Sequence, residues 1–111
     1  MQTVIETRTY IKAAARAGMN EAEMAAVVDL IAANPEAGAA IQGTGGCRKV
    51  RVAGRGKGKS GGYRLITFYS GPEMPAFLLT VFSKGDADNL TKSECNALAV
   101  LTKELIASCR R

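Results

Sequence analysis

The sequence contains no histidine and no tryptophan, and its three cysteines form no closely spaced pair. A zinc centre or a disulfide framework uses more cysteines or histidines at shorter spacings. We therefore expect neither a metal nor a cofactor, and a catalytic histidine pair is excluded. Cys95 and Cys109 recur with the apolar residues of a predicted C-terminal helix, so we expect both of them in the core.

Long apolar stretches are also missing, since no run of about 18 such residues is present to cross a bilayer. The N-terminal MQTVIETRTY lacks the basic, apolar and small-residue order of a signal peptide. These two absences predict a cytoplasmic protein that does not contact a membrane. The length of 111 residues suits one hydrophobic core, so we expect a single domain over residues 1–111.

Acidic residues are absent from residues 37–72, although this segment holds seven of the fifteen lysines and arginines. The segregation makes one contiguous basic patch rather than an evenly charged surface. Such a patch attracts phosphate-bearing partners or acidic proteins. Its members are Arg48, Lys49, Arg51, Arg55, Lys57, Lys59 and Arg64.

The N-terminal third predicts a strand followed by two helices. TVIET is β-branched, and the alanine-rich TYIKAAARAG favours a helix that ends at Gly18. Asn20 stands three residues before Glu23, which is the spacing of a capping box, and the apolar residues that follow recur at helical spacing. Asn34 and Pro35 end this second helix.

The remainder predicts three strands and a closing helix. CRKVRV, YRLITFY and AFLLTVFS are rich in β-branched and aromatic residues, and their short connections favour antiparallel pairing. Thr91 and Glu94 have the spacing of a second capping box. The fold class is therefore α+β, with a small antiparallel sheet packed by helices in the order β-α-α-β-β-β-α.

The stretch GRGKGKSGGYR, residues 54–64, admits several interpretations. AGRGKGKS fits a loose phosphate-loop pattern, but that motif must open a helix, and here a strand follows. A flexible hairpin tip is a second interpretation. The cations continue into both flanking strands, which favours a third interpretation, a loop that closes around a polyanion such as single-stranded RNA. Arg64 would then make a planar contact with phosphate.

Nearly the whole chain resembles the RelE/ParE superfamily of toxins from type II toxin–antitoxin systems, with its HigB-like branch nearest. The resemblance is carried by ANPEAG, GTGGCRKVRV, GRGKGKSGGYR and LLTVFSKGDADNLT. It implies the same order of elements and a ribonuclease that cuts messenger RNA in the ribosomal A site. Attack by a 2′-hydroxyl would leave a 2′,3′-cyclic phosphate and a 5′-hydroxyl. It also implies a cognate antitoxin, with a helix-turn-helix region through which the complex reaches operator DNA.

The resemblance also assigns roles to residues. It implies that Arg64 lies at the scissile phosphate, that Lys57 or Lys59 activates the 2′-hydroxyl, and that Lys84 lies near the leaving oxygen. Crowded cations disfavour one another's charge, so a lysine among them can act as a base, while the others stabilise the phosphorane. A tyrosine that RelE-type members carry after Lys84 is replaced by residues 87–90, ADNL.

RNA binding is expected from the other cations and from one tyrosine. Tyr63 has two interpretations, since it could stack on a nucleobase or pack in the core. The predicted RNA-binding residues are Arg48, Lys49, Arg51, Arg55 and Tyr63.

Two other functions stay open. ParE-like relatives resemble this fold and act on DNA gyrase, so the chain could be an inhibitor of a protein target. Binding to gyrase would give no reason for a phosphate-binding group such as Lys57, Lys59 and Arg64, whereas RNA cleavage requires one. The third possibility is an RNA-binding module without chemistry, whose affinity would depend strongly on salt.

Overall fold

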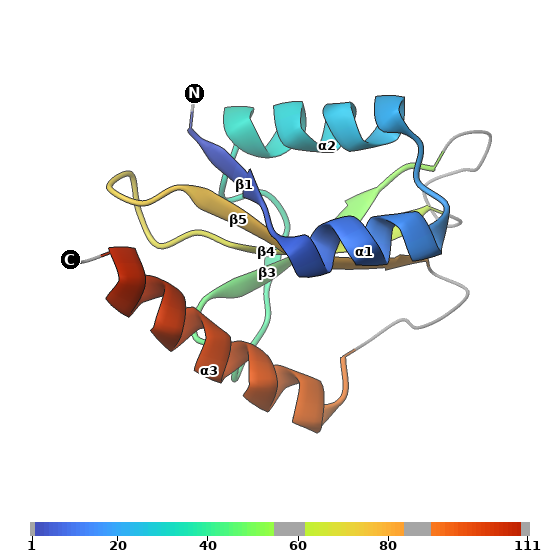
Figure 1. The fold of residues 1–111 in the computed structure, drawn as a ribbon. Helices are drawn as coiled ribbons and strands as arrows, with labels where there is room; N and C mark the ends of the chain where they lie inside the picture. The colour runs from blue at the N-terminus through green and yellow to red at the C-terminus, as the bar shows by residue number, and fades with distance from the viewer. Residues whose placement is uncertain (1, 55–61, 84–89, 110–111) are drawn as a thin grey trace.

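The computed structural model describes residues 2–54, 62–83 and 90–109 (Figure 1). It confirms the α+β class and the predicted order of the main elements, and it adds the two-residue strand β2. The elements are β1 (Val4–Glu6), α1 (Arg8–Ala17), α2 (Glu21–Ala33), β2 (Ala39–Ala40), β3 (Cys47–Val52), β4 (Tyr63–Phe68), β5 (Ala76–Ser83) and α3 (Lys92–Cys109).

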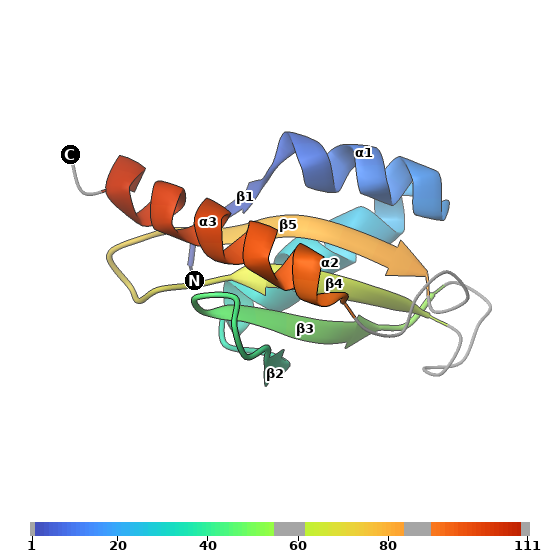
Figure 2. The ribbon, with the colours of Figure 1, turned by 90° about the horizontal axis from the view of Figure 1, so that it is seen from below.

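The strands form one sheet in the order β1-β5-β4-β3-β2. The predicted antiparallel pairing is confirmed for β3 with β4 and for β4 with β5. Strand β1 instead joins β5 in parallel, with Val4 opposite Ala76, so the sheet is mixed. The long chain between these two strands permits the parallel pair. Helices α1 and α2 cover one face of the sheet and α3 covers the other (Figures 1 and 2).

Both predicted capping boxes are confirmed. The Asn20 side chain accepts from the backbone N–H of Glu23 at 2.7 Å, and the Glu23 carboxylate accepts from the backbone N–H of Asn20 at 3.0 Å. Thr91 and Glu94 make the same reciprocal pair at 3.1 and 2.8 Å. Helix α1 ends at Gly18, whose φ of 84° is left-handed. These local signals define where the helices begin and end.

Two apolar clusters hold the layers together. One packs α1 and α2 on the sheet around Tyr10, Ile31 and Leu65. The other lies under α3 around Ile66 and Phe68. Every residue of the central strand β4 is buried, because helices cover both of its faces.

The cysteine prediction is wrong for α3. Cys109 is exposed and Cys95 is half-buried, whereas Cys47 on β3 is buried. Cys109 is the last residue of α3, and that end of the helix extends past the strands beneath it (Figure 2). Helical spacing placed Cys109 on the apolar stripe, but no sheet lies under the last turn to bury it.

Tyr10 is fully buried, and its hydroxyl has no hydrogen-bond partner among the described residues. Burial, with a smaller contribution from the Glu6 carboxylate, raises the pKa of the Tyr10 phenol to about 12. A buried hydroxyl without a partner costs about 1–3 kcal/mol. We therefore expect Tyr10→Phe to raise the free energy of unfolding at pH 7 by about 1 kcal/mol.

The same substitution should flatten the alkaline stability profile. The folded state keeps the Tyr10 proton while the unfolded state, whose pKa is 10.0, loses it. The free energy of unfolding therefore falls as pH rises from about 10 to about 12, by about 2–3 kcal/mol. Urea denaturation of both proteins from pH 7 to 11.5 measures this. Parallel profiles for the two proteins would contradict the prediction.

Candidate nucleic-acid interface

The predicted basic site lies at one end of the sheet. Val52 at the end of β3 pairs with Tyr63 at the start of β4, and Tyr63 pairs with Ser83 at the end of β5. Residues 54 and 62, which flank residues 55–61 of the predicted loop, and Ser83 at the end of β5 are therefore described at this end of the sheet. The predicted site residues Arg55, Lys57, Lys59 and Lys84 lie outside the described residues.

Arg64 is the predicted catalytic residue that the structure does place. It lies on β4 with only 3% of its surface exposed, between Arg51 on β3 and Phe82 on β5 in the sheet register. Its one hydrogen bond to a described residue runs from Nη1 to the Tyr63 carbonyl, at 3.4 Å. Burying a guanidinium is costly unless acceptors surround it, and among the described residues only the Tyr63 carbonyl accepts from Arg64.

Lys49 and Arg51 share the α3 face of the sheet with Arg64. Side chains alternate along a strand, and residues opposite each other in an antiparallel pair point to the same face. Arg51 is opposite Arg64, and Lys49 is two residues earlier on β3. Arg51 is exposed and Lys49 is half-buried. Three predicted cations are thus brought together on one face.

Arg48 points to the other face of the sheet. Its Nη1 donates to the Gly38 carbonyl at 3.3 Å, so the side chain holds the connection that leads into β2. The structure does not bring Arg48 together with the other three cations.

Tyr63 lies in the core, as the second of its two interpretations proposed. Its side chain is 4% exposed and belongs to the cluster beneath α1 and α2, and its hydroxyl donates to Glu23 Oε1 at 3.3 Å. Burial raises the pKa of the Tyr63 phenol, and the charge and the hydrogen bond of Glu23 add to the rise. The ring in this position has no face open for a nucleobase.

Gly62 was not singled out by sequence reasoning, although it precedes Tyr63 within SGGY. A Cβ at Gly62 would overlap the Val52 carbonyl and crowd Ala53 and the Gly54 amide. Only glycine permits this approach of two backbones. The two described ends that flank residues 55–61 are therefore held against each other.

A family model describing the RelE toxin of the RelE / RelB toxin–antitoxin system matches residues 2–111. The chain belongs to the RelE toxin family. Membership implies a cognate antitoxin as partner, and toxins of this family are in general endoribonucleases. The basic end of the sheet is consistent with a nucleic-acid substrate.

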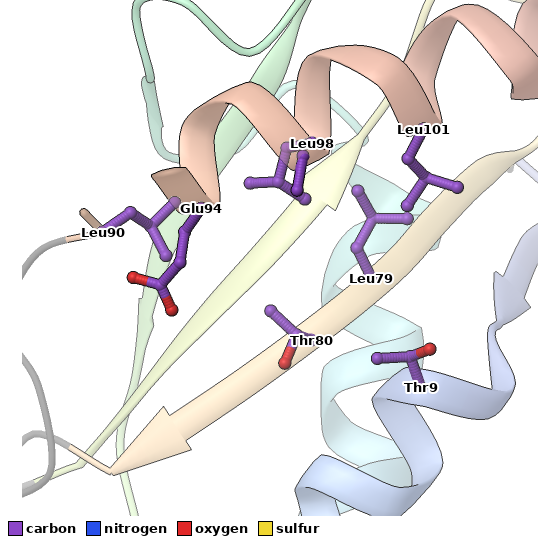
Figure 3. Close-up of a pocket in the computed structure, with 8 residues that line it drawn as sticks. Thr9, Leu79, Thr80, Leu90, Glu94, Leu98 and Leu101 are labelled. Atoms are coloured by element: carbon purple, nitrogen blue, oxygen red, sulfur yellow. The ribbon is translucent and has the colours of Figure 1, made fainter. Parts of the chain in front are cut away.

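A separate apolar pocket of about 250 Å³ lies between α3 and β5 in this RelE-family chain (Figure 3). Leu98 and Leu101 point from α3 toward Leu79 on β5, and Thr9 on α1 closes one side. Its described lining includes the carboxylate of Glu94 and no cation. The pocket therefore does not suit an RNA phosphate.

Metal ligands do not gather in the described part of this RelE-family toxin: no group of three His, Cys, Asp or Glu side chains there could hold an ion. Nor is any helix among residues 2–54, 62–83 and 90–109 both long and apolar enough to cross a bilayer.

Proposed function

We propose that this RelE-family toxin is an endoribonuclease that cuts messenger RNA in the ribosomal A site and so inhibits translation. The observation that carries the proposal is the placement of Lys49, Arg51 and Arg64 on one face of the sheet, with Arg51 and Arg64 paired next to its end. Because ribosomes are cytoplasmic, the enzyme would act in the cytoplasm. The cognate antitoxin silences the enzyme and, through a helix-turn-helix region, carries it to operator DNA.

The chemistry proceeds without a metal or a histidine. Lys57 or Lys59 takes the proton from the 2′-hydroxyl, and O2′ attacks the adjacent phosphorus. The Arg64 guanidinium donates to two phosphate oxygens and stabilises the extra negative charge of the phosphorane. The bond from phosphorus to O5′ then breaks, and Lys84 supplies a proton to O5′. The products are a 2′,3′-cyclic phosphate and a 5′-hydroxyl.

The other cations bind the RNA backbone. Arg51 is exposed beside Arg64, Lys49 adds a second charge on β3, and Arg55 follows Arg51 by four residues in the sequence. Neutralising several phosphates makes affinity fall as salt rises. Arg48 faces away from this group, and Tyr63 supports the site from the core.

Inducible expression without antitoxin, with mapping of the 5′ ends of cellular messenger RNA, tests the function. We expect growth arrest, in-frame cuts within translated regions, and 5′-hydroxyl ends that a polynucleotide kinase can label directly. Growth arrest with intact messenger RNA would contradict the proposal and favour a protein target such as DNA gyrase. RNA binding without products would favour the module without chemistry.

Lys57→Ala and Lys59→Ala should each weaken cleavage by about 10- to 100-fold, because each removes a candidate base or a charge that stabilises the transition state. Both variants should also be easier to produce. Lys103→Ala is the matched control, since it removes one exposed lysine in the middle of α3. Cleavage is measured on ribosomes that carry a defined messenger RNA. Normal toxicity of the Lys57→Ala/Lys59→Ala double variant would refute both roles.

A further inference from the structure

One carboxylate oxygen links two distant elements beside the candidate site. Glu23 Oε1 accepts from the backbone N–H of Asn20 at 3.0 Å and from the Tyr63 hydroxyl at 3.3 Å. The first bond belongs to the capping box at the start of α2. The second reaches 40 residues along the chain to the first residue of β4. The phenol is thereby fixed to a helix end rather than held by apolar contacts alone.

Arg64 is the next residue on β4, so its position depends on that of Tyr63. Successive side chains of a strand point to opposite faces, and the Tyr63 ring points to the α1 and α2 face while Arg64 points to the α3 face. The Tyr63 carbonyl also accepts the hydrogen bond from Arg64 Nη1, at 3.4 Å. Holding the phenol therefore holds the backbone from which the guanidinium projects.

A purely structural role would not require this hydroxyl. Tyr10 lies in the same cluster, 0% exposed against 4% for Tyr63, and its hydroxyl has no partner among the described residues. The core therefore accepts a tyrosine ring without a hydroxyl bond. The tyrosine that makes one is the one adjacent to Arg64, and its partner is the Glu23 carboxylate, at 3.3 Å.

We propose that Glu23 is a positioning residue, which acts through the Tyr63 hydroxyl to hold Arg64 where it meets the scissile phosphate. The inference rests on the proposed ribonuclease function. Glu23 itself touches neither the substrate nor the reacting atoms. It sets the geometry of a group that does.

Kinetics on ribosomes programmed with a defined messenger RNA test the proposal. Tyr63→Phe and Glu23→Ala should each lower kcat by about 10- to 100-fold with KM changed less than about twofold, because the guanidinium is misplaced and not lost. The double variant should be no slower than the slower single variant, since both remove the same link. Glu23→Gln keeps an acceptor and a residue suited to the capping box, so it should retain most of the activity.

Two matched variants separate positioning from stability. Asn20→Ala weakens the same helix end but leaves Glu23 and Tyr63 in place, and Tyr10→Phe removes a hydroxyl from the same core. Both should keep kcat within about twofold of the unsubstituted protein. The proposal is overturned if Tyr63→Phe keeps its kcat, or if Asn20→Ala and Glu23→Ala lose kcat alike.

A readout independent of cleavage distinguishes this inference from the function on which it rests. The ¹H–¹⁵N signal of the Arg64 guanidinium should shift in Tyr63→Phe and in Glu23→Ala and stay in place in Tyr10→Phe. An unmoved signal in Tyr63→Phe overturns the positioning role, whether or not the protein cuts RNA. A moved signal in a protein that cuts no RNA supports the link and overturns the proposed function alone.

Discussion

Replacing Arg64 by methionine is expected to lower cleavage by about 100- to 1000-fold, the usual effect of removing a preorganised donor to transition-state charge. Methionine fills much of the same volume but cannot donate to phosphate. The substitution should also abolish growth arrest and leave antitoxin binding unchanged, because the fold is retained.

We expect Arg64→Met to lose activity without losing stability. Arg64 is 3% exposed, and its one bond to a described residue is long, so we expect its buried charge to contribute little to the stability of the fold. The free energy of unfolding of Arg64→Met should therefore equal or exceed that of the unsubstituted protein. An enzyme that loses its reaction and gains stability has lost a functional group, not its structure.

Single-turnover cleavage on programmed ribosomes and urea denaturation measure the two effects. Arg64→Lys is the control for charge, and it should keep part of the activity, because a lysine supplies a point charge without the planar pair of donors. Cleavage by Arg64→Met at the normal rate would refute the role of Arg64. Failure of Arg64→Met to fold would show that the arginine serves the core instead.

Gly62→Ala is the second substitution with a large expected effect. Its Cβ would overlap the Val52 carbonyl, and backbone atoms cannot swing aside as the end of a side chain can. Overpacking of this kind costs about 1–3 kcal/mol. The end of β3 and the start of β4 must separate, which moves Arg64 and the origin of the basic segment. We expect cleavage to fall at least tenfold.

Gly43→Ala is the matched control for lost stability. Gly43 has a φ of 80°, a Cβ added to it would meet open space, and it lies before the start of β3, at the opposite end of that strand. Alanine there costs about 1–2 kcal/mol of backbone strain. Both variants should unfold at lower urea concentration, but only Gly62→Ala should lose cleavage at 25 °C. Equal cleavage by the two variants would show that the junction at Gly62 does not serve the site.

The secondary structure was predictable wherever its signals are local. The capping boxes at Asn20 and Thr91 need only residues within one turn, so each was correct as predicted. Strands β3, β4 and β5 follow one another through short connections, which predicted their antiparallel pairing. The parallel pairing of β1 was not predictable, since its partner on β5 lies more than 70 residues away. Strand β2 has two residues, too few to produce a pattern.

Some features of the candidate site were also predictable from the sequence, and others were not. The sequence by itself determined that the cations gather in one acid-free segment, that glycines surround them and that Arg64 follows on a strand. Only the tertiary structure decided that Arg64 lies opposite Arg51, and so shares a face with Lys49 and Arg51, and that Tyr63 bonds to Glu23. Caps and strand propensity depend on neighbours along the chain. Faces, burial and the link from α2 to β4 depend on packing between residues far apart in sequence, which no local pattern records.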